Sequence, residues 1–255
     1  MTDLDQPFLD FAEFDPHYVA GITPRKAAPR EWAIGDPLYL SRVQLDRRDP
    51  QVSRIVGDAQ MLKSWVIKPF GDTARDQNGM LYSVEIVNNV VLLYVQSHTA
   101  QNWWFTAGSP HVTVTEPKRI EEQIDHLRQG AAYKFRVAVA AYDDVAAPDR
   151  PDRNGRPATR RRHLELPQQQ VGWLNKRLSG AARIEWISGT VTGTVEGVQQ
   201  DVEGMPKNNR IAFKRTTISG KLTVHDPEAL AMIRRRGIGP EKAYGCGLLH
   251  LQVSR

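Results

Sequence analysis

Residues 81–97 read LYSVEIVNNVVLLYVQS, two short apolar runs separated by Asn88 and Asn89. Both runs are rich in valine, isoleucine, leucine and tyrosine, a composition that favours strands in runs of this length. An asparagine pair between two such runs is typical of a tight turn, because asparagine tolerates the backbone conformations that short turns require. The stretch therefore predicts a β-hairpin.

The segments that flank the hairpin predict a βαββαβ unit. Residues 38–45, LYLSRVQL, alternate apolar and polar side chains as a strand does, and residues 50–68 contain a helical stretch. Beyond the hairpin, residues 116–130 predict a helix with Thr115 as its N-cap, and residues 133–141, YKFRVAVAA, predict a further strand. This order is that of the ferredoxin-like split motif.

A second unit with a similar order follows. Residues 167–180, PQQQVGWLNKRLSG, predict a helix closed by Gly180, and residues 182–198 and 209–225 predict two long strands. Asp226 and Pro227 then suit the cap and first turn of a helix that ends at Gly237, and GLLHLQV predicts a closing strand.

These elements place the chain in the α+β class, with two tandem ferredoxin-like domains. Residues 1–36 contain four prolines and no sustained period, and they are expected to form an N-terminal extension. Residues 37–142 form the predicted first domain and residues 160–255 the second. Between them, residues 143–159 are rich in aspartate, proline and arginine, which predicts a linker.

The positive charge is concentrated in one half of the sequence. The 255 residues carry a net charge of +5, but residues 1–145 hold 15 Lys/Arg against 19 Asp/Glu, whereas residues 146–255 hold 19 against 10. A basic half on a weakly acidic body indicates a polyanionic partner. A basic surface that serves only solubility is the alternative.

Several classes of protein are disfavoured. The one cysteine, Cys246, allows neither an intramolecular disulfide nor a cysteine-based zinc cluster, and it fits a reducing cytoplasm. No apolar run approaches the roughly 20 residues of a membrane span, and the acidic N-terminus does not have the order of a secretory signal. We therefore expect a cytoplasmic protein without a membrane partner. The sequence has no HExxH motif and no acidic set with metal-site spacing, so neither a metal nor a cofactor is expected.

Residues 234–249, RRRGIGPEKAYGCGLL, combine four glycines with a basic run. Glycine permits positive φ and lets backbone N–H groups approach a phosphate closely, and basic side chains add charge-assisted contacts. The candidate anion-binding residues are Arg234, Arg235, Arg236, Gly237, Gly239, Lys242, Gly245 and Gly247. A glycine-rich helix-to-strand connection with an exposed basic helix end explains the same pattern equally well.

The loop sequence GIGPEKAYGCGLLHL resembles the signature loop of the repeat-associated RNA-binding superfamily of CRISPR systems, and most of all that of the CasE family. LYLSRVQL, VLLYVQS, QQQVGWLNKRLSGAARI and ISGKLTVHDPEAL resemble further segments of that family, in the same order, so the resemblance spans about residues 37–254. It implies two ferredoxin-like domains and binding to the stem-loop of a CRISPR repeat. It further implies metal-independent cleavage at the 3′ base of that stem, after which the protein stays on the guide RNA with the other Cascade subunits.

A second basic segment is RNGRPATRRRH, residues 153–163, which has five arginines in eleven positions. Arginine suits phosphate contacts and bidentate reading of guanine. The resemblance implies a basic element that lies against the RNA stem, with Arg160, Arg161, Arg162 and His163 as RNA-binding candidates. A disordered basic loop with only non-specific attraction is the alternative.

The sequence departs from the family at the position of its catalytic histidine. In DAQMLKSWVIKPFGD, residues 58–72, Gln60 and Leu62 match the family pattern, but Lys63 stands where the histidine is expected. A lysine has a reference pKa of about 10.4, so it is a poor general base unless it is desolvated. As a cation it can still stabilise charge that develops on a phosphate.

Three hypotheses about function remain at this stage. The chain is an endoribonuclease that processes precursor crRNA with Lys63 as a catalytic residue, or it is a catalytically impaired subunit that only binds the crRNA hairpin. A pair of general RNA-binding domains unrelated to CRISPR is the third reading. Among the histidines, His163 and His98 are the first candidates to replace the missing base.

Overall fold

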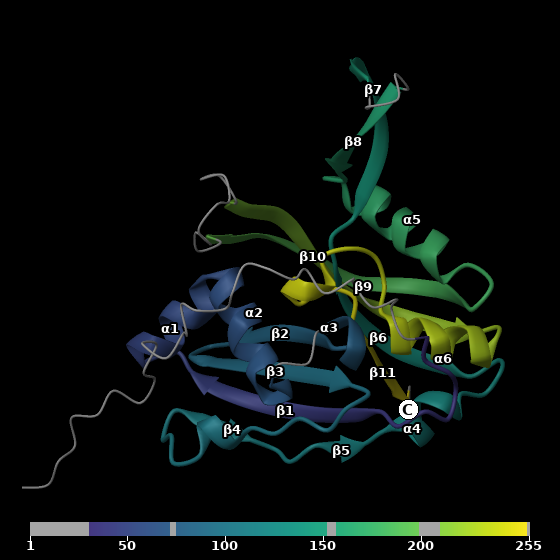
Figure 1. Cartoon of the computed structure of the whole chain (residues 1–255). Helices are drawn as coiled ribbons and strands as arrows, with labels where there is room; N and C mark the ends of the chain where they lie inside the picture. The colour runs from purple at the N-terminus through teal and green to yellow at the C-terminus, as the bar shows by residue number, and fades with distance from the viewer. Residues whose placement is uncertain (1–30, 72–74, 152–156, 199–209, 254–255) are drawn as a thin grey trace, which may run out of the picture.

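The computed structural model describes residues 31–71, 75–151, 157–198 and 210–253 and contains two antiparallel sheets that carry helices, plus a separate two-stranded ribbon (Figure 1). The first sheet has the order β2-β3-β1-β4, and β5 pairs with β1 beside β4. Its strands are β1 (Tyr39–Asp46), β2 (Leu81–Val87), β3 (Val90–Ser97), β4 (Val112–Val114) and β5 (Lys118–Arg119).

The predicted hairpin is confirmed as β2 and β3, which pair from Leu81–Gln96 to Val87–Val90. Asn88 has a φ of +55°, the left-handed conformation that asparagine tolerates in tight turns. The predicted helical stretch is two helices, α1 (Pro50–Gly57) and α2 (Ala59–Ile67), followed by η2 (Lys68–Phe70) and α3 (Arg75–Asn78). The helices separate at Asp58, whose extended backbone ends α1 and caps α2.

The predicted helix over residues 116–130 is mostly wrong. Within this range only α4 (Glu121–Asp125) is helical. The short 3-10 helix η3 (Trp104–Thr106) lies earlier in the chain, between β3 and β4. Pro117 disfavours helical backbone at the residue before it. Lys118 and Arg119, the two residues after Pro117, instead pair with the edge of β1, and Ile120 N–H donates to the Leu38 carbonyl. The segment predicted as one helix is therefore a short strand, β5, followed by a short helix, α4.

The strand over residues 133–141 is confirmed as β6 (Ala132–Val139), but its assignment to the first domain is wrong. It lies between β10 (Arg210–Val224) and β11 (Leu249–Val253) in the second sheet, whose order is β11-β6-β10-β9, with β9 spanning Ala182–Val198. Together with α5 (Pro167–Leu178) and α6 (Pro227–Arg236), these strands give a complete βαββαβ unit that begins at β6. Alternating side chains identify a strand but not the sheet it joins, so the sequence misplaced it.

The segment predicted as a linker, residues 143–159, belongs to a pair of strands in the structure. The residues after β6 form a ribbon of β7 (Tyr142–Pro151) and β8 (Pro157–His163), which Figure 1 shows projecting from the body of the molecule. The register pairs Tyr142 with His163 and Val145 with Arg160. Near its base the ribbon exposes Val145 and the three arginines that follow Thr159. A strand pair outside any core has no need of an apolar face, which is why the sequence shows no strand period here.

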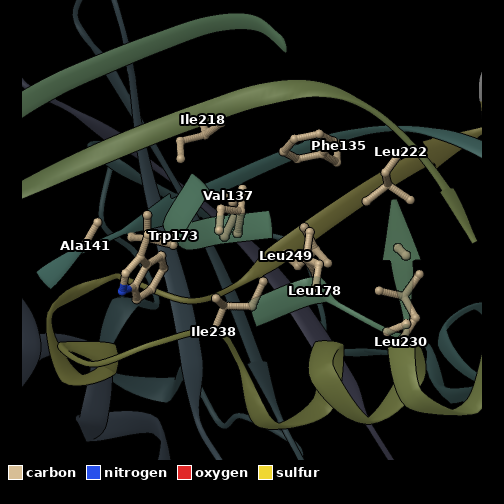
Figure 2. Close-up of a cluster of buried hydrophobic side chains, with 14 of the residues drawn as sticks. Phe135, Val137, Ala141, Trp173, Leu178, Ile218, Leu222, Leu230, Ile238 and Leu249 are labelled. Carbon is tan, nitrogen blue, oxygen red and sulfur yellow. The ribbon is translucent and has the colours of Figure 1, made fainter. Parts of the chain in front are cut away.

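Each sheet forms a hydrophobic core with its own helices. In the second domain, Figure 2 shows Val137 of β6 and Leu249 of β11 against Leu178 of α5 and Leu230 of α6, all at most 2% exposed. In the first domain, Leu93 of β3 packs in a cluster with residues of both α1 and α2. Burial of such side chains contributes roughly 1.5–3 kcal/mol each to the free energy of unfolding.

Polar contacts join the two domains. Arg235 of α6 is fully buried and forms a bidentate pair with Asp125, at 2.9 Å from Nε to Oδ1 and 2.5 Å from Nη2 to Oδ2. Burial raises the pKa of the Asp125 carboxyl, but hydrogen bonds from Arg235 and from the Gly35 amide outweigh it, so the pKa is lowered. Ser83 Oγ of β2 lies 2.8 Å from Nε2 of His250 on β11.

The described part of the N-terminal extension crosses this junction. Gly35 N–H donates to Asp125 Oδ2 at 2.9 Å, and the Asp36 carbonyl accepts from Arg235 Nη1 at 3.0 Å. Trp32 stacks on His98 with ring centroids 3.8 Å apart. Residues 1–30, most of the predicted extension, lie outside the described residues. No helix in the described ranges is long and apolar enough to span a membrane.

We predict that Arg235→Met lowers the free energy of unfolding by roughly 3–5 kcal/mol, because it leaves the buried Asp125 carboxylate without its cation. Urea denaturation followed by circular dichroism measures the change. Arg236→Met is the matched control on the next, exposed residue, and its effect is expected to stay within about 0.5 kcal/mol. Equal stabilities of the two variants would contradict a structural role for Arg235.

Candidate functional site

The glycine-rich loop connects α6 to β11 and is fixed along its length by backbone hydrogen bonds. Gly237 N–H closes the helix on the Ile233 carbonyl at 2.8 Å. Ile238 N–H donates to the Gly247 carbonyl at 2.9 Å, and Gly247 N–H donates to the Ala138 carbonyl of β6 at 2.7 Å. These three amides are satisfied within the protein, so they do not provide the predicted cradle for a phosphate.

The four glycines allow close packing. Each has a φ between +73° and +91°, and a Cβ on any of them would come within 3.1 Å of a neighbouring atom. A Cβ at Gly237 would lie 2.7 Å from Leu81 of β2, and one at Gly245 would lie 3.1 Å from Tyr82. A Cβ at Gly239 would lie 2.5 Å from Trp173 of α5. The loop therefore packs against the first domain on one side and α5 on the other.

The three arginines that precede the loop have different environments. Arg235 is the buried partner of Asp125, so its predicted role in RNA binding is wrong for this conformation. Arg234 is half-buried, with Nη1 3.3 Å from the Gln123 carbonyl, and burial lowers its pKa to about 10. Arg236 is exposed, and its carbonyl accepts from Lys242 Nζ at 2.7 Å. Arg236 is therefore the most exposed of the three arginines.

Lys63 lies at the same junction. It is on α2, a helix of the first domain, and its Nζ lies 5.5 Å from the centre of the Tyr244 ring in η4 (Lys242–Tyr244) of the loop. Tyr82 Oη of β2, also in the first domain, donates to the Ala243 carbonyl of the loop at 3.1 Å. The predicted catalytic position and the signature loop, about 180 residues apart in sequence, are thus brought together.

Aromatic side chains extend this cluster to the base of the ribbon. Tyr244 packs with Phe213 of β10, at 6.1 Å between ring centroids, and Tyr142 of β7 joins the same cluster. Tyr142 packs against His163 with ring centroids 4.2 Å apart and the rings tilted by 40°, and the Arg161 guanidinium lies 5.9 Å from the Tyr142 ring. Burial raises the pKa of Tyr142 to about 12. We call Lys63, Tyr142, His163, Phe213 and Tyr244 the junction cluster.

Several arginines lie on the elements that form the junction cluster. Arg160, Arg161 and Arg162 are all exposed on β8. Arg215 of β10 is half-buried, and a Cβ on Gly245 would lie 3.3 Å from its Nη1. Strand geometry directs the side chains of Arg160 and Arg162 to one face of the ribbon and that of Arg161 to the other. The ribbon therefore presents cations on both faces.

Of the two histidines that the sequence suggested as substitutes, His163 belongs to the junction cluster and His98 does not. Burial lowers the pKa of His163, and its Nε2 accepts from the Lys214 amide at 3.4 Å. His98 is buried, its ring stacks on that of Trp32, and its Nδ1 lies 2.8 Å from the Pro37 carbonyl, in the segment that leads into β1. His17 lies outside the described residues.

The described ranges contain no group of three or more His, Cys, Asp or Glu residues that could hold a metal ion. Cys246 is buried in a small apolar cluster beside Phe213, and burial raises the pKa of its thiol to about 12. It is therefore neither a metal ligand nor a nucleophile in this structure. The sequence prediction that no metal or cofactor is needed stays a prediction.

Sequence reasoning missed Tyr142, Phe213, Tyr244 and Arg215. Tyr244 stands inside the loop motif and could have been singled out there, as the aromatic residue of GPEKAYG. Tyr142 and Phe213 gave no signal, because an aromatic residue at a strand end is as typical of a core as of a site. Only the fold places them beside Lys63.

This geometry can be compared with known proteins. A family model described as "CRISPR associated protein" matches residues 38–252. The chain belongs to this CRISPR-associated family. The region that the family model matches begins at Leu38. The residues from Trp32 to Asp36, which cross the domain junction, therefore lie before the matched region.

Individual members of the CRISPR-associated family agree with this assignment. The Cascade subunit CasE of Escherichia coli K12 is 31% identical over 181 residues, 71% of this chain and 83% of that protein. The endoribonuclease Cse3 of Thermus thermophilus is 27% identical over 165 residues, 62% of this chain and 71% of that protein. A structure of Cse3 bound to a 19-nucleotide RNA superimposes with a TM-score of 0.68 at 22% identity, covering 84% of this chain and 99% of that one. At this identity the superposition shows the shared fold of two ferredoxin-like domains.

We predict that Gly237→Ala destabilises the chain by more than about 1 kcal/mol, because it imposes both a positive φ on alanine and a contact of 2.7 Å with Leu81. Thermal denaturation measures the effect. Gly193→Ala in β9, where a Cβ meets nothing within 4 Å and φ is not positive, is the matched control and is expected to be neutral or slightly stabilising. A neutral Gly237→Ala would show that the loop does not need its close packing.

Proposed function

We propose that this protein binds the stem-loop of a CRISPR repeat RNA, cleaves the precursor at the 3′ base of the stem without a metal, and stays on the crRNA hairpin as a Cascade subunit. The relatives are named as a Cascade subunit and a CRISPR-associated endoribonuclease, and these names support a CRISPR RNA as the ligand and Cascade as the complex. The observation that carries the proposal is that the junction cluster joins Lys63, the signature loop and the base of the arginine ribbon in one place.

The ribbon is the proposed grip on the RNA backbone. Three consecutive exposed arginines rise about 3.3 Å per residue along β8, so cations on both faces can reach phosphates of neighbouring strands. The deep major groove of A-form RNA is too narrow for side chains to read along a continuous stem. We therefore place the ribbon at the end of the stem, where the groove opens, with His163 and Tyr142 at its base.

The proposed reaction is an internal transfer at one phosphate. The ribose 2′-oxygen forms a bond to the adjacent phosphorus as the bond from phosphorus to the 5′-oxygen breaks. The 2′-hydroxyl proton passes to an acceptor, and the departing 5′-oxygen takes a proton from a donor. The products are a 2′,3′-cyclic phosphate and a 5′-hydroxyl, and no co-reactant is consumed.

Lys63 is proposed to stabilise the negative charge that develops on the phosphate oxygens. A protonated lysine cannot accept the 2′-hydroxyl proton, but it can lie beside the phosphate as a cation that is fixed before reaction. Tyr244 supports this role, because its ring face lies near the ammonium group and keeps it at the loop. His163 is the nearby candidate for proton transfer, although its Nε2 is already engaged by the Lys214 amide.

A catalytically impaired crRNA-hairpin-binding subunit is the second candidate function. It is favoured by one specific observation, the lysine at the position where the family's histidine is expected. Both candidates share the RNA grip and differ only in the chemical step.

The deciding experiment incubates the protein with its cognate repeat RNA in EDTA under single-turnover conditions. We predict cleavage that leaves a cyclic phosphate, and a loss of roughly 10²–10³-fold in rate for Lys63→Ala, the effect of removing one charge-stabilising group. Lys68→Ala is the matched control, since Lys68 is exposed and its ammonium lies 5.6 Å from the Phe105 ring, outside the junction cluster.

Affinity measured in the same assay separates the remaining outcomes. Intact RNA that is nevertheless tightly bound would reject cleavage and leave the hairpin-binding subunit. Equal affinity for unrelated hairpins would reject the CRISPR repeat as the specific ligand.

A further inference from the structure

Asp58 contacts both domains through one carboxylate. Its Oδ1 accepts from the amides of Gln60 at 2.8 Å and Met61 at 2.9 Å, which caps the N-terminus of α2. Its Oδ2 accepts from the amide of Val198, at the end of β9 in the second domain, at 3.0 Å. One side chain therefore begins the helix that carries Lys63 and ties it to the opposite domain.

A close backbone contact accompanies this hydrogen bond. Gly197 packs directly on the first turn of α2, where a Cβ would lie 2.9 Å from the Gln60 amide nitrogen and 3.1 Å from that of Ala59. Any larger residue would push β9 away from the helix. This end of β9 is still paired with β10, through Val198 and Arg210, and Figure 1 shows this end of the strand pair beside α2.

The helix is thus held by two elements of the second domain at two points. Its N-terminus rests on the end of β9, and one turn later Lys63 reaches η4 of the glycine-rich loop, with Nζ 5.5 Å from the Tyr244 ring. A helix fixed at one point can still pivot, whereas two points also set its direction. The direction of α2 decides where the Lys63 ammonium lies.

We propose that Asp58 is a positioning residue that orients α2 across the domain junction and so places Lys63 at the RNA. The inference rests on the proposed function only in taking RNA as the ligand of Lys63. Both carboxylate oxygens of Asp58 are already engaged by backbone amides, so we assign it no contact with the RNA. Its effect passes through Lys63.

Asp58→Asn is the informative substitution. Asparagine is as good an N-cap as aspartate, so Oδ1 can still accept from Gln60 and Met61. The new amide group, however, turns a donor toward the Val198 N–H and removes the link between the domains. The matched control is Asp49→Asn, because Asp49 caps α1 through the Val52 amide at 2.8 Å, within the first domain.

The test is a double-mutant cycle between Asp58→Asn and Lys63→Ala, with both single variants, the double variant and the Asp49→Asn control. Affinity for a repeat hairpin that carries a 2′-deoxyribose at the cleavage position is measured for every protein, together with the cleavage rate on the all-ribose hairpin. Because the affinity arm needs no cleavage, a wild-type protein that fails to cut contradicts the proposed nuclease and leaves this inference fully tested.

We expect Asp58→Asn to lower the cleavage rate about tenfold and the affinity at least threefold, and Lys63→Ala to have little further effect on affinity in the Asp58→Asn background. Asp49→Asn is expected to stay within about twofold of wild type in both measurements. Additive effects of the two substitutions would overturn the inference, and so would a Lys63→Ala variant with wild-type affinity. Equal losses for Asp49→Asn and Asp58→Asn would reduce the role of Asp58 to that of an ordinary helix cap.

Discussion

The close contact between the glycine-rich loop and strand β2 is the constraint on which the rest of the site depends. Gly237 and Gly245 have no Cβ, and their backbone therefore reaches Leu81 and Tyr82 of the other domain. This contact brings η4 next to α2, and with it Tyr244 next to Lys63. Two of the four glycines that the sequence suggested as a phosphate cradle, Gly237 and Gly245, thus pack against the other domain at the junction that forms the proposed site.

Two further ties act on the same junction from different sides. The buried Arg235–Asp125 pair lies on one side, together with the strap formed by residues 31–36, and the Asp58 contact with β9 lies near α2. Both ties use charged groups whose hydrogen bonds reach across to the partner domain. The Arg235–Asp125 pair is buried and therefore costly to break, whereas the Asp58 contact lies nearer the surface, and together they hold the domains in this arrangement.

Much of the fold could be predicted from the sequence because its signals are local. The Asn88–Asn89 turn and the Asp226 cap each depend on a few adjacent residues. The sheet that β6 joins, and the ribbon in place of a linker, depend on contacts with residues far along the chain. The same holds for the site. Lys63 and the loop were identified by motif, but the burial of Arg235 and the place of Tyr142 follow only from packing.

The central claim is that RNA lies across this junction, between the ribbon and α2. Photo-cross-linking tests it most directly, with a 2′-deoxy repeat hairpin that carries a photoreactive nucleotide at the 3′ base of its stem. We predict cross-linked peptides from α2 around Lys63 and from η4 around Tyr244. Cross-links confined to the exposed groove between α5 and β9, around Trp186, would contradict the account.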